Sequence, residues 1–111
     1  MSYKIKSRIW IEGKNGTFLA EGRIALMKQI IKSGSITAAA KSMKMSYKKA
    51  WEMIDGMNKE AKEPLVIRVS GGKGGGGTQV TEEGVRAIKL FDALNKKCQI
   101  FLDKEIAKLD L

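Results

Sequence analysis

The 111-residue sequence contains no histidine, one cysteine (Cys98) and one proline (Pro64). Without an imidazole there is no Ser-His-Asp triad, and the usual Cys/His zinc sites are excluded. A lone cysteine cannot form an intrachain disulfide, which fits an intracellular protein. No apolar run approaches the roughly 18 residues of a membrane span, and no signal peptide is recognisable. We therefore expect a cytoplasmic protein that is not an enzyme and has no metal or other cofactor.

Apolar residues are plentiful enough for a core, because 43% of the chain is hydrophobic and 30% is charged. These proportions are typical of a globular protein rather than a disordered one. A chain of this length buries enough surface to fold without disulfides. We expect residues 1–111 to form a single domain.

Positive charge is in excess, with 21 Lys and Arg against 12 Asp and Glu, a net charge of +9. The whole excess lies in residues 1–80, whereas residues 81–111 balance six cations with six anions. Such a surface attracts polyanions, nucleic acid above all. Many basic proteins bind no polyanion, so the charge alone favours solubility as its explanation.

The N-terminal third predicts a hairpin and a helix. Residues 3–12 alternate between apolar and basic side chains, which is typical of a half-buried strand. Residues 13–16 predict a turn, and residues 17–19 a short returning strand. Apolar residues at helical spacing then predict a helix from about residue 21 to 32, which Gly34 ends.

Residues 35–60 predict two short helices joined by a tight turn. Ser35 is placed to cap a helix built on three consecutive alanines, which Lys44 closes. Ser46 is placed to cap a second helix, whose inward side would carry Ala50, Met53, Ile54 and Met57. This arrangement describes a helix-turn-helix. The generic alternative is an αα-hairpin that only completes a core, and the exposed aromatic and basic residues weigh against it.

A β-hairpin is predicted directly after the second helix. Residues 65–69 and 78–80 are its strands, and six glycines with Lys73 lie between them. The phosphate-binding P-loop requires a lysine after the glycines and a helix immediately behind it, and both are missing here. A βαβ dinucleotide-binding unit is missing as well. We therefore favour a DNA-contacting wing over a merely flexible tip, with Lys73 supplying charge.

The C-terminal segment predicts one long helix. Thr81 is placed to cap it, and two glutamates in its first turn complement the helix dipole. An apolar stripe follows to the chain end, and Cys98 on this stripe is interpreted as a small core residue rather than a reactive thiol. A helix of about 28 residues spans roughly 42 Å. Because that exceeds a small domain, we expect its far half to pack on a second copy.

Several strings together resemble the N-terminal DNA-binding domain of the molybdate-responsive transcriptional regulators, the ModE family. They are Gly22-Arg23, Gly34-Ser35-Ile36, Ala38-Ala39-Ala40, the run Met45 to Trp51, Met57-Asn58, Pro64-Leu65, the run Gly71 to Gly77, and Thr81 to Gly84. They cover about two-thirds of the chain in the family's order. The helix-turn-helix is also similar to that of LysR-type regulators. Full-length ModE members carry C-terminal molybdate-binding domains that this sequence does not contain. We accordingly expect a stand-alone regulator without molybdate binding.

The predicted fold is α+β and mostly α: a winged helix-turn-helix with an N-terminal hairpin and a long C-terminal dimerisation helix. The helix-turn-helix falls at about residues 35–60, the wing at 66–80 and the last helix at 82–109. The resemblance implies a dimer on operator DNA, and two-fold symmetry then predicts an inverted-repeat site. A non-specific chromatin-like or RNA-binding protein would explain the charge equally well.

We expect the second helix of the motif to enter the major groove. Lys48 or Lys49 would reach guanine, and Tyr47 a phosphate or a thymine methyl group. For Trp51, a place at the DNA surface and a place wedged between helices remain equally open. Phosphates would be held by Ser35 and Thr37, through hydroxyls or helix-end amides, and by Lys73. The expected DNA-binding residues are therefore Ser35, Thr37, Ser46, Tyr47, Lys48, Lys49, Trp51 and Lys73.

Overall fold

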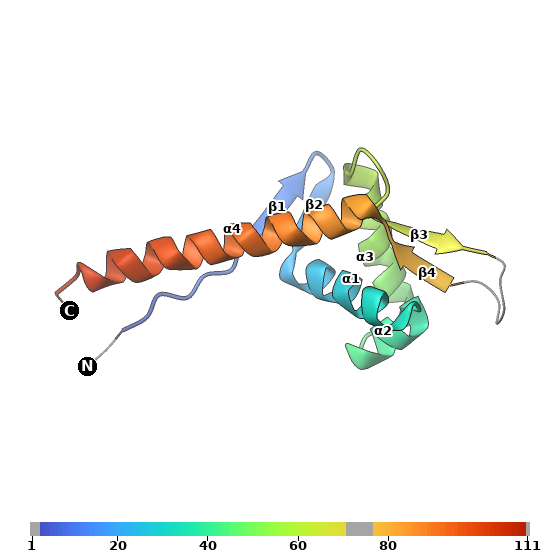
Figure 1. The fold of residues 1–111 in the computed structure, drawn as a ribbon, viewed down its shortest axis with the longest axis horizontal. Helices are drawn as coiled ribbons and strands as arrows, with labels where there is room; N and C mark the ends of the chain where they lie inside the picture. The colour runs from blue at the N-terminus through green and yellow to red at the C-terminus, as the bar shows by residue number, and fades with distance from the viewer. Residues whose placement is uncertain (1–2, 71–76, 111) are drawn as a thin grey trace.

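The computed structural model describes residues 3–70 and 77–110 (Figure 1). The elements follow in the order β1 (Trp10–Gly13), β2 (Gly16–Ala20), α1 (Glu21–Ser33), α2 (Ile36–Ser42), α3 (Tyr47–Glu60), β3 (Val66–Val69), β4 (Gly77–Val80) and α4 (Glu82–Ala107). The winged helix-turn-helix, the N-terminal hairpin and the long C-terminal helix are all present, so the predicted fold is confirmed. Most of the glycine loop, including Lys73, lies outside the described residues.

The N-terminal strand is shorter than predicted, because it begins at Trp10 rather than near residue 3. Strand β1 pairs antiparallel with β2, and Trp10 lies opposite Ala20. The chain enters α1 at the next residue, so no strand remains to pair with residues 3–9. That segment runs instead beside α4 (Figure 1), where Gln99 Nε2 donates a hydrogen bond to the Ile5 carbonyl over 2.8 Å.

Helix α1 is the centre of the core. Leu26, Met27 and Ile30 are fully buried on it, together with residues from every other helix and from strands β2, β3 and β4. Gly34 adopts a left-handed conformation with φ of 69° and ends α1, as predicted. The N–H of Thr78 on β4 donates to the Gly34 carbonyl over 3.1 Å. The end of α1 therefore fixes where the wing lies.

The two helices of the motif begin at the predicted caps. Ser35 Oγ accepts a hydrogen bond from the Ala38 N–H over 3.1 Å, and Ser46 Oγ accepts one from Lys49 N–H over 3.0 Å. Between the helices, Lys44 takes a left-handed φ of 56° and makes the tight turn. These local contacts stabilise both helix starts.

The wing is anchored to the far end of α3. Strands β3 and β4 pair antiparallel, with Val66 opposite Val80. Asn58 on α3 binds the start of β3 twice, because its Nδ2 donates to the Val66 carbonyl over 2.9 Å and its Oδ1 accepts from Leu65 N–H over 2.8 Å. The amide side chain thus sets the position of the wing relative to α3.

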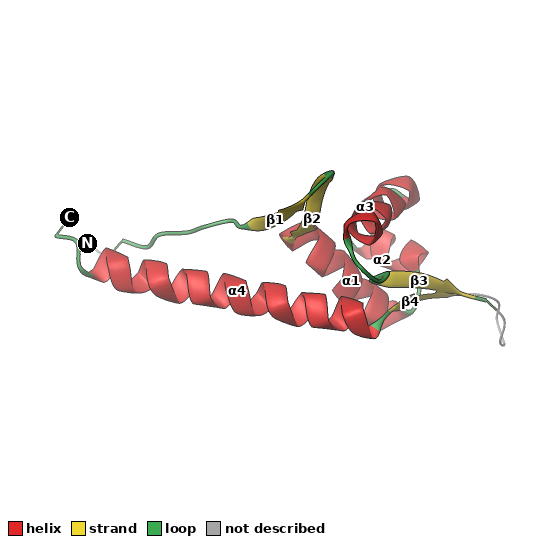
Figure 2. Ribbon diagram, turned by 90° about the horizontal axis from the view of Figure 1, so that it is seen from above, coloured by secondary structure: helices red, strands yellow, loops and turns green. Residues whose placement is uncertain are grey.

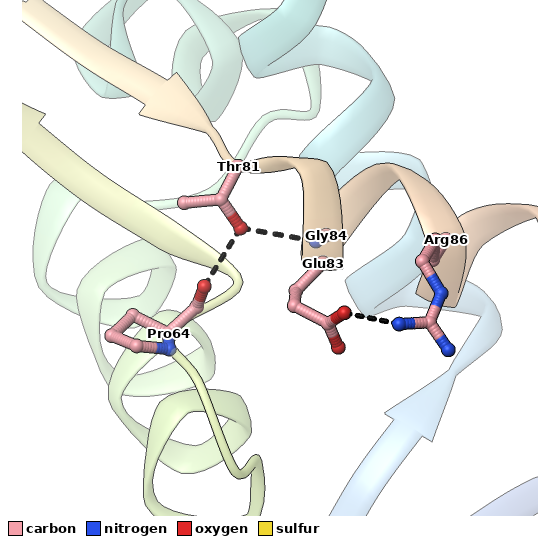
Figure 3. A network of polar contacts seen from close by, with 5 residues as sticks. All are labelled: Pro64, Thr81, Glu83, Gly84 and Arg86. Atoms are coloured by element: carbon pink, nitrogen blue, oxygen red, sulfur yellow. Dashed lines mark hydrogen bonds and ion pairs between the residues drawn. The ribbon is translucent and has the colours of Figure 1, made fainter.

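A threonine joins α4 to the chain before the wing (Figure 3). Thr81 Oγ1 accepts from the Gly84 N–H over 3.1 Å, as predicted for a cap, and it also donates to the Pro64 carbonyl over 2.7 Å. One turn further along, Glu83 and Arg86 form an ion pair. The start of α4 is therefore held to the chain that enters the wing.

Helix α4 extends well beyond the core (Figure 2). Its 26 residues span about 39 Å. The described chain measures 61 × 29 × 22 Å, with a radius of gyration of 16.9 Å, whereas a compact chain of this length has about 13 Å. Ile88 and Phe91 are buried, but Leu94 and Phe101 farther along are 39% and 62% exposed.

The interpretation of Cys98 as a core residue is wrong. Its side chain is half-buried and lies outside the buried cluster. Cys98 Sγ lies 3.6 Å from Ser7 Oγ, so its cover comes from the N-terminal segment. The physical reason is that α4 has already left the core at this point.

Candidate nucleic-acid interface

The first turn of α3 presents an exposed basic and aromatic surface. Tyr47 is 48% exposed, and Lys48 and Lys49 beside it are exposed as well. The opposite side of the helix is fully buried, through Ala50, Ile54 and Met57. Burial of that side forces the remaining side chains outward, which leaves the start of the helix accessible to a groove of DNA.

A cleft of about 380 Å³ lies between the start of α3 and the wing. It is lined by Ser35, Ile36, Thr37, Tyr47, Trp51, Arg68, Val69, Ser70, Gly77 and Thr78. Four of the eight predicted site residues therefore meet at one place, although they come from two helices and the segment before α2. Among the described residues of the lining there is no carboxylate to repel an anion.

Trp51 lies at the boundary between the core and the cleft, and its place at a DNA surface stays a prediction. It packs against the buried core and also lines the cleft. Its ring meets Tyr47 edge to face, with centroids 6.3 Å apart and an interplanar angle of 69°. Its indole Nε1 is buried and has no hydrogen-bond partner among the described residues.

Arg68 on β3 belongs to this site, and the sequence analysis did not single it out. Its guanidinium carbon lies 4.1 Å from the centroid of the Trp51 ring, a typical cation–π contact. The sequence offered one indication of a role for Arg68, because it is the one cation in the predicted strand 65–69. Its proximity to Trp51 depends on how the wing packs on α3, which no local pattern reveals.

The other predicted residues are not gathered in the cleft. Ser46 uses its hydroxyl oxygen to cap α3, so its role in the free protein is structural. Lys48 and Lys49 lie on the exposed side of the same turn and do not line the cleft. Lys73 lies outside the described residues.

Arg23 is a cation that holds elements of the fold together. It donates hydrogen bonds to the carbonyls of Thr17 and Phe18, and burial lowers the pKa of its guanidinium. Gly56 on α3 leaves room for it, because a Cβ at that position would lie 3.0 Å from the guanidinium nitrogens. The contact ties the hairpin to α1 and α3, away from the cleft.

Across residues 3–70 and 77–110, no group of three or more His, Cys, Asp or Glu side chains is placed to hold a metal ion. Within the same ranges, no helix has the length and apolar character needed to cross a membrane.

A helix-turn-helix whose second helix is exposed at its start, followed by a two-stranded wing, defines a winged helix-turn-helix protein. Comparison with known families agrees with this class. The model of the bacterial regulatory helix-turn-helix proteins of the LysR family matches residues 22–85. The chain belongs to this family.

Within this family, the chain is similar to proteins named ModE. The chain is 44% identical over 104 residues to the "Molybdenum transport protein ModE" of Azotobacter vinelandii, covering 94% of this chain and 38% of that protein. It is 53% identical over 72 residues to the "Transcriptional regulator ModE" of Yersinia pestis, covering 65% and 27%. It is 50% identical over 72 residues to the "DNA-binding transcriptional dual regulator ModE" of Escherichia coli K12, covering 65% and 28%. The chain thus spans well under half the length of these relatives.

Proposed function

We propose that this protein is a sequence-specific DNA-binding transcriptional regulator that inserts the start of α3 into the major groove. The observation that carries the proposal is the exposed turn Tyr47 to Lys49, which stands beside the wing on a family-matched scaffold. Lys48 or Lys49 would donate to guanine O6 and N7, and Tyr47 would contact a phosphate or a thymine methyl group. The role is binding rather than catalysis, in keeping with relatives named as regulators.

The remaining predicted residues would position the protein on the DNA backbone. Ser35, Thr37 and Trp51 would face phosphates from the cleft, and Lys73 would do so from the wing loop. Ser46 would act indirectly, because its cap holds the reading turn in shape. Support comes from one continuous core beneath the motif and the wing, which leads us to propose that they act as one domain.

We further propose that two copies pair through α4. Leu90, Leu94 and Phe101 follow one another at helical spacings of four and seven residues, and their side chains are 54%, 39% and 62% exposed. Such a stripe is unfavourable in water and suits a facing helix. A two-fold dimer would place two α3 helices on one side, so its operator would be an inverted repeat.

Selection from a random duplex-DNA library tests the proposed function. Binding is carried out at about 150 mM salt, where non-specific phosphate attraction is already weakened. We expect enrichment of an inverted repeat. Retention of DNA without an enriched sequence would instead indicate a non-specific nucleic-acid binder. A failure to retain duplex DNA would contradict DNA binding altogether.

A further inference from the structure

A groove of about 580 Å³ lies between β2, the end of α3 and the start of α4. Phe18, Leu65 and Leu90 give it apolar walls, and charged side chains such as Lys62 and Glu83 also line it. Leu90 is 54% exposed, and pockets of this volume hold ligands larger than one side chain. The groove is therefore large enough for an aromatic side chain from outside the domain.

One side of α4 runs from this groove to the far end of the helix. Residues at alternating spacings of four and three lie along that side and form a seam. They are Glu83, Ala87, Leu90, Leu94, Lys97, Phe101, Lys104 and Lys108. The first three line the groove. Phe101 lies about 17 Å farther along the helix than Leu90, so its side chain cannot reach the groove of its own chain.

The charges along the seam favour an antiparallel partner helix. A parallel pair would bring Glu83 against the partner's Glu83 and Lys97 against the partner's Lys97, and like charges repel. In an antiparallel pair, Glu83 meets the partner's Lys108. Leu90 then lies opposite the partner's Phe101, because each is seven residues from its end of the seam. Glu83 and Lys108 also pair within their own helix, so their contact sets direction more than strength.

We propose that the groove binds Phe101 of a second copy, with the two α4 helices antiparallel, so that each domain holds the far half of its partner's helix. This inference rests on the proposed pairing through α4 and names the surface that receives it. The contact covers Leu90 and buries an aromatic side chain that is 62% exposed in the single chain. Two-fold symmetry makes the contact twice in each dimer. A parallel pair would leave both grooves unfilled.

Engineered disulfides test the direction of the helices. In a Cys98→Ser background, Glu83→Cys and Lys108→Cys place two thiols about 38 Å apart on one helix. A disulfide requires Cα atoms within about 7 Å, so a bond between positions 83 and 108 must join two chains. We expect mild oxidation to form that bond in the double variant. Each single variant should cross-link no faster than Lys96→Cys, which lies on another side. Rapid cross-linking of a single variant would indicate parallel helices and overturn the proposal.

A photoreactive side chain tests the groove itself. The amino acid p-benzoylphenylalanine at position 101 retains an aromatic ring and bonds to neighbouring side chains on irradiation. We expect it to link to the partner's groove at residues 17–19 or 61–65, as identified by mass spectrometry of joined peptides from mixed isotope-labelled and unlabelled chains. The same amino acid at position 109, which is exposed but outside the seam, should not link there. Links from position 101 only to residues 94–108 of the partner would overturn the seating in the groove.

Sedimentation equilibrium measures the strength of pairing, after thermal unfolding has shown that each variant is folded. We expect Phe101→Ala to raise the dimer dissociation constant at least about a hundredfold, because each dimer loses two buried rings. Leu109→Ala should change it by less than about threefold. Equal effects of the two variants would overturn the seating of Phe101. A monomeric wild-type protein would overturn pairing through α4 and this inference with it, whereas enrichment of a DNA sequence by that monomer would leave the proposed DNA binding intact.

Discussion

At the scale of single residues, Lys49 has the position expected of a base-reading side chain. It lies on the exposed first turn of α3, and its backbone N–H is held by the Ser46 cap. Because the cap fixes the backbone at this turn, binding has to order only the side chain. Lys59, near the other end of the same helix, is exposed as well and provides a matched control.

We predict that Lys49→Ala relaxes sequence preference at one base pair of the operator, with a loss of about 1–3 kcal/mol of discrimination. Lys59→Ala should leave the preference unchanged. The measurement is competition binding against single-base variants of the selected site. By contrast, Lys73→Ala should weaken all sequences alike and lower the salt slope by about 1. Identical, sequence-independent losses from Lys49→Ala and Lys73→Ala would contradict base reading by Lys49.

Gly84 is required for close packing rather than for an unusual backbone conformation. A Cβ at this position would overlap the Leu65 carbonyl oxygen and the Val80 side chain. Gly22, in the first turn of α1, differs, because its nearest neighbour would be Met53 Cε at 3.7 Å, an ordinary contact. The same substitution at the two positions therefore has opposite consequences.

We predict that Gly84→Ala lowers the free energy of unfolding by about 1–3 kcal/mol, because a backbone carbonyl cannot move aside cheaply. Gly22→Ala should raise it by about 0.5 kcal/mol, since alanine favours the helix and restricts the unfolded chain. Urea unfolding followed by circular dichroism measures both. Equal effects at the two positions would show that packing at Gly84 does not matter.

At the scale of elements, Thr81 connects α4 to the chain that enters the wing (Figure 3). Its hydroxyl caps the helix by accepting from Gly84 N–H, and it donates to the Pro64 carbonyl. Valine has nearly the same shape and no hydroxyl. Serine retains the hydroxyl and loses only a methyl group.

We predict that Thr81→Val destabilises the protein by about 1–3 kcal/mol, because both hydrogen bonds disappear and the Gly84 N–H loses its cap. Thr81→Ser should retain most of the stability. Thermal and urea unfolding of the two variants measure the difference. Valine and serine variants of equal stability would contradict the role given to the hydroxyl.

Predictions for whole elements succeeded where local signals decide the structure. Ser35, Ser46, Thr81 and Gly34 mark helix ends through contacts within a few residues, and all four act as predicted. The predicted strand over residues 3–12 is longer than the observed one. Alternating apolar and polar side chains indicate an extended, half-buried segment, and they do so whether or not that segment pairs with another strand. Whether it pairs depends on where β2 ends, which is decided at Ala20.

At the scale of the whole molecule, helix α4 carries a stripe of exposed apolar side chains. Leu90, Leu94 and Phe101 share one side of the helix, whereas Lys96 lies on another. Pairing of two copies would remove this apolar surface from water. A charge within the stripe should oppose pairing, and a charge elsewhere on α4 should not.

We predict that Phe101→Glu converts a dimer into a monomer, with about half the mass in light scattering, because burial of a carboxylate in the paired apolar surface is unfavourable. Lys96→Glu makes a larger change of charge on a different side and should leave the dimer intact. A monomeric wild-type protein would contradict pairing through α4. Dissociation by both variants would attribute the effect to charge rather than to the stripe.

The sequence by itself determined the helix ends, the two-helix motif, the wing strands and the long last helix. Each depends on the periodicity or capping of neighbouring residues, and such interactions act over a few positions of the chain. It also indicated the exposed start of α3, since burial of one side of a helix leaves the other to solvent.

Only the tertiary structure decided which distant residues meet. Arg68 lies over the ring of Trp51, 17 positions away, because Asn58 and the end of α1 together set the position of the wing. Cys98 is covered by the N-terminal segment and does not lie in the core, because α4 extends beyond the other helices at this point. Contacts of this kind depend on how the elements pack in space. Local sequence patterns do not predict that packing, because they describe only residues that are close together along the chain.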